Sequence, residues 1–316
     1  MNGWGRRISM AAVGLLLSAC VDMPSPPLTT APPAPEVTPI APEAIAAPSR
    51  QSELLSLYYA RLQNDLLAQG LMRTDDGHVD APFTDTHLTA NFIRIALFDE
   101  YTNAGGTLRA RVTSSALRRW DQPIRMNVQF GANVPADIVA TDRDYIASFA
   151  ARLSSITGLR ISQVSNGGNF HVLVLNEDDR RAAGPLIRSL IPTIDDSSLR
   201  YAVNLPRDQL CVVIGTFKPD GHTYQSAVAI IRAEHPELMR QSCYHEELSQ
   251  GLGLANDSPR ARPSIFNDDD EFALLTRHDE LLLKILYDPR LSTGMTEAEA
   301  TPIVRQIAAE LVGGPV

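Results

Sequence analysis

The sequence has no excess of positive charge and no long hydrophobic run. Its 28 Lys and Arg face 37 Asp and Glu, giving a formal net charge of −9. A nucleic-acid-binding domain usually carries a basic stripe, and this sequence has none, so no nucleic-acid partner is expected. The apolar run at residues 8–19 is shorter than the roughly 20 residues of a membrane-spanning helix. The chain has 316 residues, of which 44% are hydrophobic, and this suffices for one sizeable domain or two small ones.

The first twenty residues have the layout of a secretory signal. Arg6 and Arg7 precede the apolar run, which ends in Leu17-Ser18-Ala19-Cys20. This ending resembles the bacterial lipobox. The resemblance implies that residues 1–19 are a signal peptide, that cleavage occurs before Cys20, and that a lipid is attached to the Cys20 thiol. The alternative is an ordinary signal peptide with a chance cysteine.

The segment that follows has the composition of a tether. Residues 20–50 are rich in Pro, Ala and Thr and have almost no large apolar side chains, so they favour extended polyproline geometry over a packed core. The expected partner here is the membrane, reached through the lipid, with the folded part facing the periplasm. Val21 after Cys20 resembles the sorting pattern that favours the outer over the inner membrane.

Two cysteines remain after Cys20. An oxidising periplasm permits a disulfide between Cys211 and Cys243. The alternative is a pair of buried free thiols.

The rest of the chain alternates between helical and extended patterns. Ser52 is the expected cap of the first helix, and residues 118–131 alternate with a period of two. The expected elements, in chain order, are a helix at 52–69, a helical or mixed segment at 86–102, a strand within 118–131, a helix at 141–156, strands at 160–164 and 170–175, a helix at 177–190, a hairpin at 211–233 turning at 219–221, a helix at 238–251, a helix capped by Thr276 and Asp279, and a tail helix from Thr296. This order predicts an α+β domain with a mixed sheet.

The stretch SCYHEELSQGLGLAND at residues 242–257 carries the strongest chemical signal. A zinc-protease helix needs two ligands at positions i and i+4, with a glutamate beside the first. If His245 were the first ligand, the second position would hold Ser249 and a third would hold Ala255, and neither suits zinc. His245 is therefore expected to be a partly exposed helix residue.

Shifting the register by one residue gives a better match. Leu252-Gly253-Leu254 resembles the segment around the glycine of the metzincin zinc peptidases, whose pattern is His-Glu-x-x-His-x-x-Gly-x-x-His. The resemblance implies a first ligand position at Glu246, a catalytic base at Glu247, a second ligand at Gln250 and a third at Asn256. The set has no histidine, so no zinc is expected.

The metzincin resemblance extends over about residues 118–288. Ser264-Ile265-Phe266-Asn267-Asp268 is similar to the methionine-containing turn, with Phe266 in place of the methionine, and the helix ending at Tyr287 is similar to the one that follows that turn. Gly253, Phe266 and Tyr287 are the implied supports of the site. The implied fold is a zincin/metzincin-like mixed sheet with an active-site-type helix and a C-terminal helix. In that description a single domain at 51–316 has a helical N-terminal part at 51–115, a core at 116–290 and a tail at 291–316.

The chain as a whole resembles a family of proteobacterial putative lipoproteins defined by a domain of unknown function, DUF2927-like. The similarity rests on five short segments. They are Glu246-Glu247-x-x-Gln250, Leu252-Gly253-Leu254-x-Asn256-Asp257, Ser264 to Asp268, Leu286-Tyr287-Asp288 and Gly294-Met295-Thr296. That resemblance implies a fold and no activity.

Three chemistries remain open for the site. Glu246, Gln250, Asn256 and Asp257 offer oxygen atoms, which suit a hard divalent ion at Glu246 and Asp257 better than zinc. The second is a metal-free carboxylate pair. Glu246 and Glu247 do not form it by themselves, because adjacent helical residues diverge by about 100°, so one of them would need a partner such as Asp257. The third alternative is a hydrogen-bonded polar cluster that binds no cofactor and joins the helix to its loop.

Three functions follow from these alternatives. The first is a non-catalytic lipoprotein that binds a peptide or an envelope protein in a protease-like cleft. The second is an envelope hydrolase of the peptidase type, with Glu247 as base. The third is a structural or assembly lipoprotein that acts through the helix at 52–69.

Overall fold

The computed structural model of the chain describes residues 47–104, 107–267 and 269–313, with the backbone alone for residues 100–112. The predicted signal peptide, Cys20 and the tether up to residue 46 lie outside the described residues.

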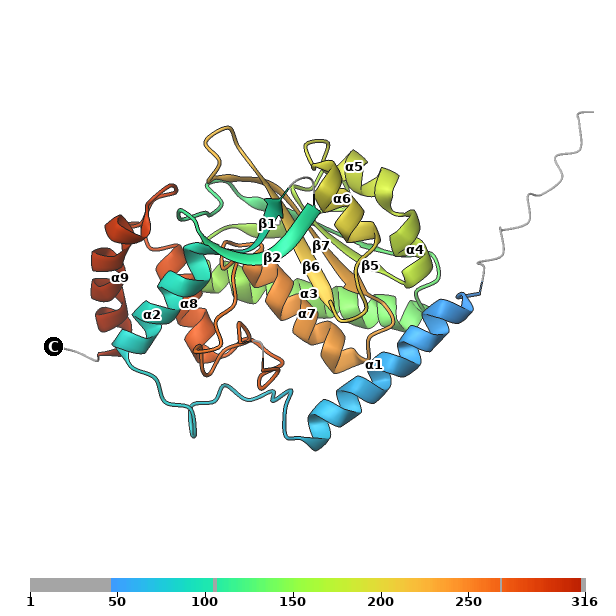
Figure 1. Ribbon diagram of the computed structural model, residues 1–316, viewed down its shortest axis with the longest axis horizontal. Coiled ribbons are helices and arrows are strands. Elements are labelled where there is room, and N and C mark those ends of the chain that lie inside the picture. Colours follow the sequence, from blue (N-terminus) through green and yellow to red (C-terminus); the bar gives the residue numbers. More distant parts are fainter. Residues whose placement is uncertain (1–46, 105–106, 268, 314–316) are drawn as a thin grey trace, which may run out of the picture. The chain divides into compact units, whose positions relative to one another are not determined.

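A mixed five-stranded sheet organises the fold (Figure 1). The strands lie in the order β4, β3, β5, β7, β6. Their bounds are β3 Ile124–Phe130, β4 Ile161–Gln163, β5 Phe170–Leu175, β6 Cys211–Phe217 and β7 Tyr224–Arg232. The first four strands in this order run parallel, and β6 pairs antiparallel with β7 at the edge. The predicted α+β class and the predicted hairpin are confirmed.

Helices cover both faces of the sheet, so the central strands are apolar on both sides. In β5 every residue is buried, with Phe170, Val172 and Val174 packing into one core and Leu173 and Leu175 into another. The first core lies under α2 Asp85–Ala96, α3 Ala136–Thr157, α7 Glu237–Gln250, α8 Arg277–Leu286 and α9 Glu297–Val312. The second lies under α4 Glu177–Ala182, α5 Gly184–Leu190 and α6 Asp196–Val203.

The first described helix, α1 Arg50–Ala68, is held by residues from much later in the chain. Ser52 Oγ donates a 2.6 Å hydrogen bond to Glu234 Oε1, and Tyr59 packs with Met239 in a small core of its own. The helix expected at 52–69 is therefore confirmed, with Ser49 as its cap in place of Ser52.

The segment expected to be helical or mixed at 86–102 divides into two elements. Helix α2 ends at Ala96, and β1 Phe98–Ala104 pairs antiparallel with β2 Thr107–Ser114. This two-stranded sheet was not anticipated, because the apolar residues before Ala96 have a helical period that obscures the point where the strand begins.

Two further helices differ from expectation. Helix α3 begins at Ala136, directly after Pro135, five residues before the expected cap at Thr141. The expected helix at 177–190 is two helices, α4 and α5, because Pro185 lacks an N–H and starts a new first turn. Helix α6 was missed altogether.

The last helices begin as their caps predict. Thr276 and Asp279 form a complete capping box on α8, and Thr296 with Glu299 forms another on α9. Within the described part of the chain, no helix combines the length and the apolarity that a membrane crossing requires.

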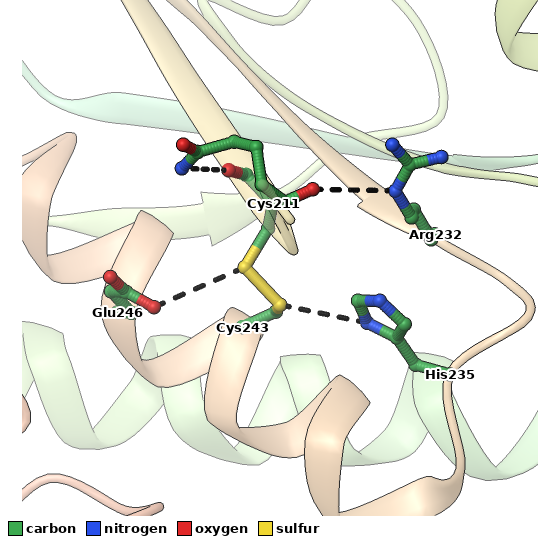
Figure 2. Close-up of a disulfide and its surroundings, with 6 residues drawn as sticks. Cys211, Arg232, His235, Cys243 and Glu246 are labelled. Carbon is green, nitrogen blue, oxygen red and sulfur yellow. Dashed lines mark hydrogen bonds between the residues drawn. A yellow bond between two sulfur atoms is a disulfide. The ribbon is translucent and has the colours of Figure 1, made fainter. Parts of the chain in front are cut away.

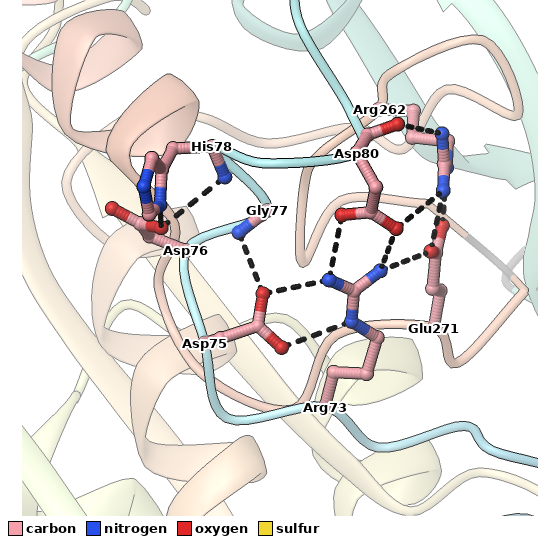
Figure 3. A network of polar contacts seen from close by, with 8 residues as sticks. All are labelled: Arg73, Asp75, Asp76, Gly77, His78, Asp80, Arg262 and Glu271. Atoms are coloured by element: carbon pink, nitrogen blue, oxygen red, sulfur yellow. Dashed lines mark hydrogen bonds and ion pairs between the residues drawn. The ribbon is translucent and has the colours of Figure 1, made fainter.

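A network of ionic side chains joins the loop after α1 to the loop before α8 (Figure 3). The Arg73 guanidinium contacts Asp75, Asp80 and Glu271 at 2.7–3.0 Å. Arg262 Nε donates to Glu271 Oε2 at 2.6 Å. Because these side chains are partly exposed, the main role of the network is to fix two loops that lie far apart in sequence.

Candidate functional site

The predicted disulfide is present and joins the sheet edge to helix α7 (Figure 2). Cys211 is the first residue of β6, Cys243 lies in the middle of α7, and their Cα atoms are 5.9 Å apart. Both residues are buried. The bridge therefore fixes the distance between an edge strand and the helix beneath it.

Helix α7 presents one polar face toward this bridge. Its position follows from Pro236, which starts the helix directly after the turn that leaves β7. Cys243, Glu246, Glu247 and Gln250 have the i, i+3, i+4, i+7 spacing that puts side chains on a single helical face.

A cleft of about 330 Å³ lies between β6 and this face of α7. Edge strand β6 forms one wall with Val212, Val213, Ile214 and Gly215. Other walls come from α7, from the loop that follows it and from the segment before β3. The residues that line it include Asp99, Arg118, Ser198, Gln209, Phe217, Tyr224, Glu246, Glu247, Gln250, Gly251, Ala255 and Asp257.

The two glutamates are closer than helical geometry alone suggests. One carboxylate oxygen of Glu246, one of Glu247 and the sulfur of Cys211 all lie within 4.8 Å of one another. Glu247 is 2% exposed and Glu246 is half-buried. Both flexible side chains turn toward the same cysteine, although adjacent helical residues diverge by about 100°.

The loop after α7 places Asp257 in the cleft. Gln250 Nε2 lies 3.4 Å from Asp257 Oδ1, a weak hydrogen bond. The Asn256 amide instead donates to the Arg94 carbonyl oxygen of α2 and to the Asp257 carbonyl oxygen, each at 2.9 Å. Among the described residues that line the cleft, Asp257 is present and Asn256 is not. The structure thus gathers Glu246, Glu247, Gln250 and Asp257, and uses Asn256 to join the loop to α2.

Gly253 is the backbone point that lets this loop turn. It has a φ of 126°, and a Cβ there would lie 2.2 Å from the Arg118 carbonyl oxygen. Only glycine fits a position with both restrictions.

Phe266 and Tyr287 pack behind the helix rather than in the cleft. Phe266 is fully buried, and its carbonyl oxygen accepts from the Ser258 N–H at 2.8 Å. The Tyr287 hydroxyl donates to the Leu252 carbonyl oxygen at 2.9 Å. Burial raises the pKa of Tyr287, so it remains a protonated donor at neutral pH.

His245 is buried, which corrects the expectation of a partly exposed residue. Its ring stacks on Phe149 with centroids 3.9 Å apart, Nδ1 accepts from the Leu275 N–H at 2.7 Å, and Nε2 lies 2.8 Å from the Tyr145 hydroxyl. Burial lowers the pKa of His245 to about 3, so it is neutral. Both nitrogens are engaged on the side of α7 that faces α3.

Several residues of the cleft carry no sequence signal. Arg118 pairs with Asp99 and lies over the Phe217 ring, 4.7 Å from its centroid. Gly215 is required because a Cβ there would lie 2.4 Å from the Tyr224 ring. These partners are separated in sequence, so no local spacing could have revealed them.

Asp142 is a further missed residue, and it fixes the helix that carries the site. Its carboxylate accepts from Arg240 Nε and from the Tyr244 hydroxyl, both at 2.7 Å. All three side chains are buried. This network fastens α7 to α3 on the side away from the cleft.

Among the residues that the structure describes, one group of three has the donor atoms and spacing for a metal ion: Cys211, Glu246 and Glu247. The Cys211 sulfur is bound to Cys243, which leaves two carboxylates as anionic donors. His245 does not join them, since Leu275 and Tyr145 engage its nitrogens. With the bridge closed, this group therefore has neither the imidazole nor the thiolate ligands that zinc prefers.

A sequence profile described as "Protein of unknown function (DUF2927)" matches residues 85–306, more than two thirds of the chain. The match includes the sheet, α7 and the cleft, and it excludes α1. No curated protein matches the chain, and no solved structure does.

Proposed function

The chain belongs to the family described as "Protein of unknown function (DUF2927)", and from this premise we propose that it binds an extended peptide segment without cleaving it. The proposed partner is a peptide or the extended part of an envelope protein. The proposed site is the cleft between β6 and α7. The protein itself is proposed to be a lipoprotein, anchored through Cys20 and facing the periplasm, with the outer membrane favoured.

The edge position of β6 carries this proposal. Within the described residues β6 pairs only with β7, so its other edge carries no paired strand, which is the arrangement that strand addition requires. That edge borders the cleft, which is lined by residues of β6 and by polar residues of α7. An extended segment would gain backbone hydrogen bonds from β6 and side-chain recognition from the cleft.

A metzincin-like arrangement is the second part of the proposal. Its support is the order of elements: a polar-faced helix follows the last parallel strand, a glycine with positive φ follows the helix, and α8 comes after the turn at Phe266. The ligand positions hold Glu246, Gln250 and Asn256. A retained scaffold with substituted ligands favours binding over hydrolysis.

A peptide-selection experiment tests the binding site. A phage library of random peptides is panned against the oxidised protein, and hydrogen exchange is then measured with a selected peptide bound. We expect slower exchange of the β6 amides. Val213→Lys in the cleft wall should weaken binding at least about tenfold, whereas Val79→Lys, at a site 82% exposed, should have no effect. Protection confined to elements other than β6 would refute the proposal.

Metal analysis of the oxidised protein tests the absence of zinc chemistry. We expect less than stoichiometric zinc after purification without chelators. One tightly held zinc per oxidised chain would contradict it.

A hydrolase remains the second candidate, because the Glu246 and Glu247 oxygens share one wall of the cleft within 4.8 Å. In this alternative Glu247 is the base that activates water. Any hydrolysis of peptide libraries or peptidoglycan fragments should then disappear in Glu247→Gln. Full activity in that variant would exclude Glu247 as the base.

An assembly role is the third candidate, and α1 supports it. Leu54 and Leu57 of this helix are 55% and 66% exposed. Replacing both with Lys should remove partners from cross-linked envelopes if α1 is the interface. Unchanged partners would count against this role.

Anchoring has its own test. Cells fed a labelled fatty acid should incorporate the label into the wild-type protein and not into Cys20→Ser. Equal labelling of the two proteins would remove Cys20 from the proposal.

A further inference from the structure

The disulfide and the two glutamates share one small volume at the end of the cleft. Glu246 Oε2 lies 4.0 Å from the Cys211 sulfur, and an oxygen of Glu247 joins the same group within 4.8 Å. Figure 2 shows Glu246 and His235 on opposite sides of the bridge, with His235 Nδ1 3.8 Å from the Cys243 sulfur. The Cys211 sulfur and two carboxylates thus lie together where β6 crosses α7, with the Cys243 sulfur bonded to Cys211.

We propose that reducing the Cys211–Cys243 disulfide creates a site for a thiophilic divalent cation such as Zn²⁺, with Cys211, Cys243, Glu246 and Glu247 as ligands. The cation site would exist in the reduced protein alone. This inference does not rest on the proposed peptide binding, which concerns the oxidised protein.

Three of the four proposed ligands come from a single helix. Cys243, Glu246 and Glu247 occupy positions i, i+3 and i+4 of α7, the spacing at which helical residues share a face. Cys211 approaches that face from β6, and the strand is held in the sheet by β7 independently of the bridge. The sulfurs are 2.05 Å apart in the bridge. Two thiolates on one tetrahedral zinc lie about 3.8 Å apart, so each sulfur needs to move by only about 1 Å once the bridge is open.

The chemistry balances with a dithiol as reductant. Two electrons from the dithiol break the Cys211–Cys243 bond, the dithiol becomes a cyclic disulfide, and its two protons pass to the cysteine sulfurs. Metal binding then displaces those protons from the thiols. The resulting ligands are two thiolates and two carboxylates, and thiolates favour zinc or cobalt over calcium and magnesium.

Three of the four proposed ligands are buried. Cys211, Cys243 and Glu247 are each 2% exposed or less, so water competes weakly for the ion.

Cobalt binding tests the proposal. The full chain is reduced with dithiothreitol, freed of reductant without air, and titrated with Co²⁺, which absorbs strongly in the near ultraviolet when thiolates bind it. We expect one Co²⁺ per reduced chain with this absorption and none in the oxidised protein. Zn²⁺ should displace the Co²⁺ and abolish the band.

Variants decide whether the folded site is the binding site. Glu246→Gln and Glu247→Gln should each weaken Co²⁺ binding at least about tenfold, since even loss of an outer-shell partner costs about 10–100-fold. Glu237→Gln, an exposed position on the same helix, is the matched control and should bind normally. Cys211→Ser should lose most of the thiolate absorption.

Circular dichroism accompanies each titration to follow folding. Absence of the thiolate band in the reduced protein would overturn the proposal. So would a band of equal strength and affinity in Glu246→Gln and Glu247→Gln, because the metal would then be held by cysteines alone. If the reduced chain is unfolded and binds Co²⁺ equally well in both glutamate variants, the proposal is overturned in the same way.

Discussion

At Gly253 two restrictions on one residue determine the shape of the loop behind the cleft. Its φ of 126° excludes side chains, and the Arg118 carbonyl oxygen fills the space where a Cβ would lie. We expect Gly253→Ala to lower the free energy of unfolding by about 3 kcal/mol, since strain and a clash with backbone act together. Gly221→Ala, with φ 74° and open space, is the control and should cost about 1 kcal/mol.

Urea unfolding of the two variants gives the comparison. Equal losses of stability would show that the Arg118 contact contributes nothing beyond the backbone conformation.

His245 makes the fold sensitive to acid. Burial lowers its folded pKa to about 3 from a model value of 6.5, so between these values the unfolded chain binds more protons than the folded one. The free energy of unfolding therefore falls as the pH falls through this window. By about pH 4.5 the expected loss from this group is on the order of 2 kcal/mol.

His245→Asn isolates this effect. Asn retains an acceptor for the Leu275 N–H but does not titrate. At pH 7 the variant should be less stable than the wild type, and the gap should narrow by about pH 4.5. The free energies of unfolding are measured with urea at each pH. A difference between variant and wild type that stays constant from pH 7 to about pH 4.5 would exclude His245 as an acid-sensitive group.

Residue identities in the cleft were partly predictable. Glu246, Glu247 and Gln250 follow from the resemblance to the metzincin pattern, Asp257 was named as a further oxygen donor, and the structure places all four in the cleft. Their relative distances were not predictable, since side-chain torsions bring two adjacent glutamates together. The position of Asn256 depends on α2, which lies 160 residues earlier in the chain.

At the scale of elements, the attachment of α7 to α3 depends on one carboxylate. Asp142 accepts hydrogen bonds from Arg240 and Tyr244, and it is 1% exposed. Asp142→Ala leaves a buried guanidinium unpaired, which should cost about 3–5 kcal/mol. Asp144→Ala, exposed on the same helix, should change stability by less than about 0.5 kcal/mol.

The measurement is again urea unfolding, with hydrogen exchange of α7 as a second signal. Faster exchange in α7 is expected in Asp142→Ala. Similar stabilities of the two variants would mean that Arg240 finds another partner.

Elements with local signals were the predictable ones. The helices α1, α7, α8 and α9 have polar caps or a proline at their start together with helical apolar periods, and their predicted bounds agree with the structure to within a few residues. The β1–β2 hairpin and α6 were missed, since neither has an apolar repeat long enough to distinguish it from a loop. Helix α6 holds its first turn through Asp195, which accepts from the Ser197 and Ser198 N–H groups.

For the whole molecule, the disulfide is the covalent link between sheet and helix. Cys211 and Cys243 are 32 residues apart, a loop whose closure should contribute about 3–4 kcal/mol. Reduction without added metal should lower the free energy of unfolding by that amount.

The Cys211→Ser, Cys243→Ser double variant should match the reduced wild type and should not respond to reductant. Free-thiol titration that finds both cysteines reactive before reduction would contradict the bridge.

The position of α1 has a consequence for how the chain folds. Its hydrogen bonds reach Arg207, Glu234 and Met239, and the ion pair from Arg73 to Glu271 spans 198 residues. Contacts between such distant residues form late, because the intervening chain must first be ordered. During synthesis α1 therefore emerges long before any of these partners exists.

Until the C-terminal third is in place, the apolar face of α1 that includes Tyr59 has nothing to cover it. Helix α1 is thus expected to be the last to dock, although it is made early, and chains truncated before Glu234 are expected to aggregate through that face.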